Sequence, residues 1–250
     1  IMVIGQFVIS IVLLSSTLLL NKQMNYIQAK ELGFDKEKLL AIHNNSLSWS
    51  GLNNFKNDLL QNPEIINASI TGFIPVVKNR ENRILFKDGI KTSSLTSYNI
   101  WFVDHSYTET LGIKILKGRG FSDKYRTDSS AVLINQSAAR TLGWDDPIGK
   151  TIGRPKSESE MSYFKVIGVI DDFNYESVHS PIMPLVLFLD YSSGALTLRL
   201  GENVNIPVLI NLSKEKWTEY EPDRPLNYSF YNESLNSMYA SEAKLNQILV

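Results

Sequence analysis

The chain opens with an uninterrupted apolar stretch and then changes to short apolar segments separated by polar ones. Residues 1–20 carry no charge, and the first charged side chain is Lys22. A helix over residues 1–21 would be about 31 Å long, close to the ~30 Å hydrocarbon core of a bilayer. The pattern predicts a transmembrane helix. A signal peptide, which should have a basic start and a small-residue cleavage site, and a buried soluble helix are the alternatives.

Helical spacing continues beyond the apolar stretch. Met24, Ile27 and Leu32 recur at roughly helical intervals, and Gly33 is a suitable residue for the C-terminal cap of a helix. We therefore predict a stalk helix over residues 22–33. This helix could pack on its own domain, or it could act as a rigid lever between a membrane and an outer domain.

Strand and helix patterns alternate in the remainder, with the same order of elements near both ends. The predicted strand–helix–strand units comprise residues 38–44, 51–61 and 66–75, and residues 194–200, 205–220 and 225–232. Such β-α-β units favour an α+β sandwich in which helices cover one face of a sheet.

The stretch between these units has shorter elements, and we interpret residues 116–172 as a small inserted α+β subdomain. The chain begins at Ile1 and ends in a helical pattern, so we expect it to be part of a longer membrane protein. The predicted division is residues 1–21, transmembrane helix; 22–33, stalk helix; 34–115 and 173–232, the two segments of the sandwich; 116–172, insertion; and 233–250, a C-terminal stalk helix leading to a second membrane helix.

Composition excludes several classes of protein. The chain has 25 basic and 26 acidic side chains, and a formal net charge of −1 gives no electrostatic reason to expect nucleic acid as a partner. It contains no cysteine, which excludes disulfide scaffolds, thiolate zinc sites and cysteine nucleophiles.

Two aspartates and a histidine near the end of one predicted strand are the main candidates for chemistry. Asp171 and Asp172 are adjacent, so on an extended chain they point to opposite faces, and His179 lies in a proline-flanked loop. A metal site needs three or four converging ligands, and the other histidines, His43 and His105, form no H-x-x-x-H pattern. We predict no catalytic residue, no metal site and no cofactor here. The aspartates are expected to cap the strand end and start a turn.

A second segment, GWDDPIGKT, is similar to a phosphate-binding loop without matching it. That motif has four residues between its first glycine and the GK pair, whereas Gly143 and Gly149 are separated by five, one of them Pro147. The segment TIGRP that follows cannot sustain the helix whose amides would bind phosphate. We predict a structural turn at these three residues.

Four phrases stand out by their order and spacing. They are QFVISIVLLSSTLLLNKQMNYIQAKELGFDKEKLLAI, LGIKILKGRGFS, VLINQSAARTLGWDDPIGKTI and VIGVIDDFNYESVHSPIMPLVLF, which together cover most of residues 6–190. Together they resemble the extracytoplasmic domain of FtsX-like ABC transporter permeases of the MacB type. The resemblance implies a porter-like part built of β-α-β elements, with an inserted smaller part, the sabre, that corresponds to residues 116–172.

The resemblance also implies a function. The domain would lie in the periplasm, between the first and second membrane helices of an inner-membrane permease. ATP would be hydrolysed by a separate ABC ATPase subunit or domain. The permease would relay the movement across the membrane, which is called mechanotransmission, in order to export or extract a substrate. The implied partners are the ATPase, a second permease copy, the lipid bilayer and other envelope proteins, and the family has no catalytic residue to carry over.

If both ends of the chain continue into the membrane, motion must pass through the stalks. Our hypothesis assigns this coupling to the side chains of Met24, Ile27, Tyr239 and Leu245. Two alternatives remain from the sequence: a membrane-anchored extracytoplasmic sensor domain of a signalling receptor, and a membrane-tethered hydrolase. Further membrane helices beyond the chain would favour the permease, and an acid–base pair in a deep pocket would favour the hydrolase.

Overall fold

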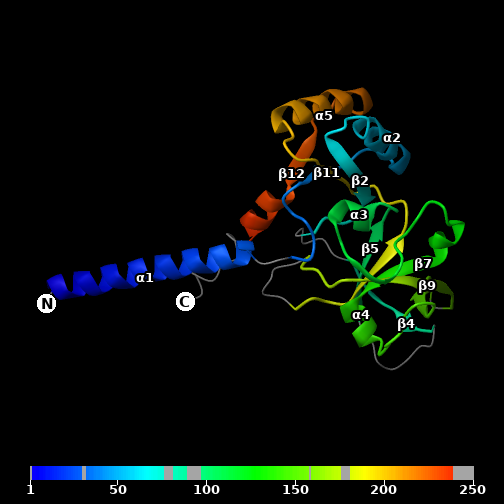
Figure 1. Ribbon diagram of the computed structural model, residues 1–250, viewed down its shortest axis with the longest axis horizontal. Helices are drawn as coiled ribbons and strands as arrows, with labels where there is room; N and C mark the ends of the chain where they lie inside the picture. The colour runs from blue at the N-terminus through cyan, green and yellow to red at the C-terminus, as the bar shows by residue number, and fades with distance from the viewer. Residues whose placement is uncertain are drawn as a thin grey trace.

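The computed structural model describes residues 2–29, 32–75, 81–88, 97–157, 159–175 and 181–238, without the side chains of Met2 and of residues 20–29. A long helix, α1 (Met2–Ala29), projects from a folded body made of two lobes (Figure 1). One mixed 12-stranded sheet runs through both lobes. The predicted α+β class is confirmed.

The first lobe is built from two segments that are far apart in the sequence. Its elements are β1 (Leu39–His43), α2 (Trp49–Leu59), β2 (Ile65–Thr71), β11 (Ala195–Leu200), α5 (Ile206–Tyr220) and β12 (Asn227–Phe230). The strands lie in the order β12-β1-β11-β2, and all three pairings are antiparallel. Two β-α-β units interleaved in this order form a ferredoxin-like arrangement.

Helices α2 and α5 cover one face of this sheet (Figure 1). The α2 pattern explains why: Leu52, Phe55 and Leu59 recur on one helical face, and all three are buried. Trp217 of α5 packs edge-to-face on Phe55, with the ring centroids 5.2 Å apart. These contacts bury the apolar stripe of each helix against the sheet, and this burial is the main stabilisation of the lobe.

The second lobe occupies the sequence between the two halves of the first. Its elements are β3 (Glu81–Ile84), β4 (Phe86–Lys87), β5 (Ser97–Val103), α3 (Tyr107–Leu111), β6 (Ile115–Gly118), the 3₁₀ helix η1 (Arg126–Ser130), β7 (Ala131–Asn135), α4 (Gln136–Thr141), β8 (Thr151–Pro155), β9 (Met161–Ile170) and β10 (Leu185–Leu189).

The strands of this lobe close into a ring. Strands β5, β10, β7, β9 and β8 are neighbours in that order, β3 pairs with β5, and β4 pairs with β8. Only Leu85 separates β3 from β4, so this segment joins the two edges. The Arg154 guanidinium of β8 lies 5.6 Å from the Phe102 ring of β5, which requires the sheet to curl. The ring encloses a separate apolar core.

The strand pairing crosses the predicted boundaries of the insertion. Strand β10 follows residue 172 in the sequence, yet it pairs in parallel with β5 and antiparallel with β7 inside the second lobe. The described lobe thus includes strands on both sides of residues 116–172. The division of the chain into domains stays a prediction.

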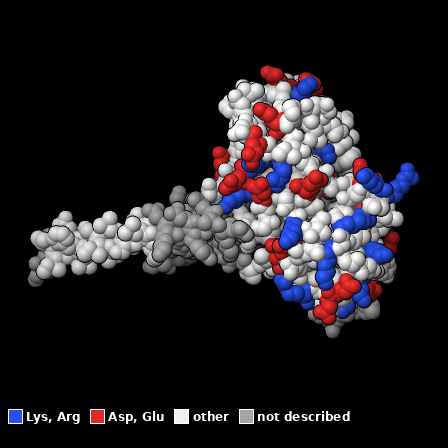
Figure 2. All heavy atoms as spheres, viewed as in Figure 1, with Lys and Arg blue, Asp and Glu red and all other residues white. Residues whose placement is uncertain are grey.

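Helix α1 is apolar on all sides over its first part. The side chains of residues 3–19 are exposed, and Phe7, Ile11 and Leu18 are each at least 60% exposed. Figure 2 shows no charged side chain on the described part of this helix, whereas acidic and basic groups mix over the visible face of the body. Among the described residues, no helix combines the length and the apolar character required to span a membrane.

Candidate coupling site

The chain enters the folded body through three residues that follow α1. Leu32 and Phe34 are buried, and the Asn174 amide donates to the Leu32 carbonyl over 2.7 Å. Gly33 lies between them with φ +82°, in the left-handed region that favours glycine. A Cβ at Gly33 would lie 2.8 Å from the Cβ of Phe173, so the chain presses directly against the residue that follows the two predicted aspartates.

The end of the described chain reaches the same place. Residues 231–238 are helical, and both Tyr231 and Leu235 are buried in the cluster that contains Phe34 and Phe173. The Phe34 ring packs edge-to-face on Phe173 and on Tyr231, with a centroid distance of 6.2 Å in each case. We call this cluster the coupling site; its residues are Leu32, Phe34, Phe173, Tyr231 and Leu235.

The coupling site is continuous with the core of the second lobe. The Trp101 ring of β5 lies 5.8 Å from Phe173 and 5.0 Å from Tyr175. The hydroxyl of Tyr175 accepts a hydrogen bond from Asn99 and donates one to the carbonyl of Met183, over 2.7 and 3.0 Å. Phe34 is thus linked to β5 through the ring contacts of Phe173 with Phe34 and Trp101.

The coupling site also touches the first lobe. The hydroxyls of Tyr231 and Thr197 on β11 are hydrogen-bonded over 2.8 Å. Burial raises the pKa of Tyr231 far above its ordinary value, and burial likewise raises that of the neighbouring Tyr107. Both phenols therefore stay neutral at physiological pH.

The two aspartates that follow β9 bind the start of α4. Asp172 accepts hydrogen bonds from the amide and hydroxyl of Ser137, both over 2.9 Å, and forms an ion pair with Arg140. Asp171 accepts a hydrogen bond from Gln136 over 2.7 Å. Negative charge is favourable at the first turn of a helix, so these contacts are structural.

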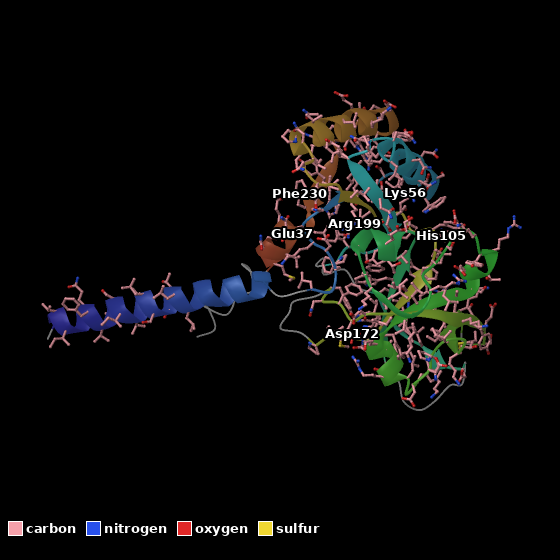
Figure 3. All side chains as sticks on the ribbon, viewed as in Figure 1. Glu37, Lys56, His105, Asp172, Arg199 and Phe230 are labelled. Atoms are coloured by element: carbon pink, nitrogen blue, oxygen red, sulfur yellow. The ribbon has the colours of Figure 1, made fainter. Side chains whose placement is uncertain are left out.

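No metal centre forms around these acids within the described residues, which contain no group of three or more potential ligands. His179 lies outside the described residues. His43 is far away on β1, where its Nε2 lies 2.9 Å from the Ser229 hydroxyl. His105 lies directly after Asp104, at the level where the lobes meet (Figure 3).

The predicted turn residues lie between α4 and β8. Gly143 and Gly149 have φ of +65° and +83°. The carbonyl of Pro147 accepts a hydrogen bond from the Lys150 amide over 3.1 Å, and the Gly149 amide donates to Val166 of β9 over 2.8 Å. The segment thus reverses the chain and fixes it to the neighbouring strand.

The predicted coupling residues and the observed coupling site differ in position along the stalks. Met24 and Ile27 belong to α1, of which only the backbone is described at these positions. Tyr239 and Leu245 lie outside the described residues. Sequence reasoning passed over Phe34, which is a single apolar residue between a glycine and a run of charges. The available signal was its position at the end of the stalk.

A family profile identifies the class of protein that this fold belongs to. The profile of the MacB-like periplasmic core domain matches residues 2–214. The chain therefore belongs to the family of MacB-like periplasmic core domains of ABC transporter permeases. This assignment favours the permease over the sensor and hydrolase alternatives.

Solved structures show the same fold at low sequence identity. The periplasmic region of MacB from Actinobacillus actinomycetemcomitans superposes with a TM-score of 0.60 and 18% identity, covering 85% of this chain and 97% of that one. The extracellular domain of the noncanonic ABC-type transporter YknZ from Gram-positive bacteria superposes with a TM-score of 0.54 and 11% identity, covering 76% and 97%. No curated protein sequence matches the chain.

Proposed function

We propose that this chain relays ATP-driven motion across the inner membrane as the periplasmic domain of an ABC transporter permease. One observation carries the proposal: Leu32 and Phe34, which follow α1 in the sequence, and the helix that begins at Tyr231 meet in the same buried aromatic cluster. A displacement of either helix therefore acts on Phe34 or Tyr231, and through Phe173 on both lobes. The movement would serve export or extraction of a substrate.

The apolar part of α1 supports a membrane anchor in this scheme. The 17 residues 3–19 alone make about 26 Å of helix, less than the ~30 Å hydrocarbon core of a bilayer, so the proposed anchor continues into the next turn of the 28-residue α1. The exposed, uncharged side chains of residues 3–19 fit a lipid environment, and the later turns would form the stalk. The folded body would then stand in the periplasm at the end of a continuous helix.

The proposal assigns the chemistry to another protein. ATP would be hydrolysed by a separate ABC ATPase subunit or domain, and the acids after β9 are engaged in holding α4. A second permease copy, the bilayer and other envelope proteins complete the set of proposed partners. The chain itself would form and break no covalent bonds.

Cross-linking of the two stalks tests the relay. Cysteines are introduced at the predicted coupling positions, Met24→Cys and Leu245→Cys, and the assembled transporter is treated with a reducible bifunctional reagent. We expect the cross-link to change ATP turnover or export, and reduction to restore both. Single-cysteine variants treated with the same reagent are the control. Unchanged turnover and export in the cross-linked protein would contradict the relay.

A further inference from the structure

The two lobes are joined through a narrow part of the sheet. Among the described residues, β2 of the first lobe and β5 of the second pair only at Thr71 and Val103. The Gly72 amide and the Thr71 hydroxyl both donate to the Phe102 carbonyl, over 3.0 and 3.2 Å. A sheet that narrows to one residue pair resists twisting weakly, so side-chain contacts set the angle between the lobes. These are the apolar cluster that joins Leu39 of β1 to Tyr107 and Leu111 of α3, and a set of polar contacts.

Asp104, the residue directly after β5, makes several polar contacts across the joint. Its carboxylate accepts from the Lys56 ammonium of α2 over 3.0 Å and from the Ser69 hydroxyl of β2 over 2.7 Å. It also accepts from the Ile70 amide over 2.9 Å, and its own amide donates to the Ile70 carbonyl over 3.1 Å. A single second-lobe residue thus binds the edge of β2 and the helix that covers its face.

Burial makes this contact directional and hard to break. The side chains of Lys56 and Asp104 are only 13% and 9% exposed. A buried carboxylate that loses its donors cannot recover them from water, so a change of angle that separates Asp104 from β2 is strongly opposed. Lys56 and Arg199 both lie at the level where the lobes meet (Figure 3).

The contact between α3 and β11, elsewhere in the same joint, is less completely satisfied. Arg199 of β11 donates through Nε to the Thr110 carbonyl over 2.6 Å and through Nη1 to Asp35 over 2.8 Å. Its Nη2, the Thr110 hydroxyl and the Tyr107 hydroxyl are buried without a hydrogen-bond partner among the described residues. Unpaired buried groups are rare in folded proteins, so this contact, unlike the fully paired one at Asp104, is the candidate for the part of the joint that moves.

From this asymmetry we infer that Asp104 is the pivot between the lobes, held in place by Lys56. When the coupling site is displaced, the α3–β11 contact shifts while the edge of β2 stays fixed to Asp104. The direction of the relayed movement is then set by the pivot. This inference rests on the proposed function for its purpose, although the pivot itself is a property of the fold.

Distance measurements by pulsed electron paramagnetic resonance test the pivot. Spin labels on Asn211→Cys of α5 and on the exposed position Tyr163→Cys of β9 report the separation of the lobes in the full-length permease with its ATPase in lipid nanodiscs. Lys56→Met removes one donor and leaves Asp104 in place. Without nucleotide, we expect one distance population in the parent protein and a second population at least about tenfold enriched in Lys56→Met.

Three further variants keep the result interpretable. Lys56→Arg retains the positive charge and should restore the single population. Lys216→Met removes an exposed pair with Glu219 on α5 of the same lobe and should leave the distances unchanged. Ser69→Ala, which removes a different donor to Asp104, should act like Lys56→Met and replaces it if that variant does not fold.

The outcomes separate the pivot from the proposed function. If the distance distribution is unchanged in Lys56→Met or in Ser69→Ala, the pivot is overturned. It is also overturned if Lys216→Met shows the second distance population to the same extent. If only the variants that remove a donor to Asp104 gain the second distance population, the pivot is supported, even if ATP changes no distance in the parent protein. In that last case the pivot stands, and the ATP-driven movement does not change the separation of the lobes, so the link of the pivot to the relay is wrong.

Discussion

The second lobe is held at two places that differ in chemistry. At the coupling site, Phe34, Phe173 and Tyr231 meet through ring edges. At the joint between the lobes, Asp104 and Lys56 meet as a buried ion pair inside a hydrogen-bond network. Apolar contacts resist compression but set no fixed angle, whereas a network of short hydrogen bonds specifies one orientation. The apolar coupling site is therefore suited to transmitting a displacement, and the polar joint at Asp104 is suited to fixing the direction of that displacement.

The largest effect on stability should come from the joint. We expect Asp104→Ala to lower the free energy of unfolding by about 3–5 kcal/mol, because it leaves a buried lysine unpaired. The control is Glu202→Ala, which removes an ion pair with Lys38 that is shorter, at 2.7 Å, but solvent-exposed. Urea denaturation should show no shift for the control. Equal effects of the two variants would show that burial does not distinguish this joint.

A smaller effect is expected at the coupling site from Gly33→Ala. Both Gly33 and Gly143 have positive φ, but a Cβ at Gly33 would clash with Phe173, whereas a Cβ at Gly143 has nothing within 4 Å. We expect a loss of about 2–3 kcal/mol at Gly33 and about 1 kcal/mol at Gly143. The difference between the two urea midpoints isolates the close approach of the stalk to Phe173. Equal losses of stability in the two variants would show that Phe173 moves away from the added Cβ at little cost.

The smallest effect is a pH dependence confined to the first lobe. Burial lowers the pKa of His43 below the ordinary histidine value, so the unfolded chain takes up this proton before the folded one does. Stability should be fully present above about pH 6.5 and should fall as the pH drops from there toward the lowered folded pKa. His43→Gln should flatten this slope. The coupling site, whose single tyrosine, Tyr231, stays neutral, should contribute no slope in that range.

The first lobe could be predicted largely from the sequence. Its helices carry clear apolar stripes, so the predicted helix over 205–220 nearly coincides with α5 (Ile206–Tyr220). The predicted strand over 194–200 likewise becomes β11 (Ala195–Leu200). Local periodicity was sufficient here because each element buries one face against a single sheet.

The ring of strands and the coupling site could not be predicted in this way. Closure of the ring depends on β4, two residues long, finding β8, and a segment that short has no readable period. The coupling site joins Phe34, Phe173 and Tyr231, which are single aromatic residues far apart in the sequence. In the segment VIDDF the two aspartates are the residues that a pattern of chemical groups selects. The contact with the end of the stalk is made by the phenylalanine, Phe173.

The central claim is that motion reaches the body through Phe34. The most direct test is the amount of substrate exported per ATP hydrolysed in the assembled transporter, compared between Phe34→Ala and Phe86→Ala. Both phenylalanines are 8% exposed, but Phe86 lies on β4, in the ring of strands and outside the coupling site. The account predicts that Phe34→Ala retains ATP hydrolysis and loses export per ATP by about tenfold or more, as expected for a coupling free energy of ~1–3 kcal/mol. An equal loss in both variants, or no loss in Phe34→Ala, would contradict it.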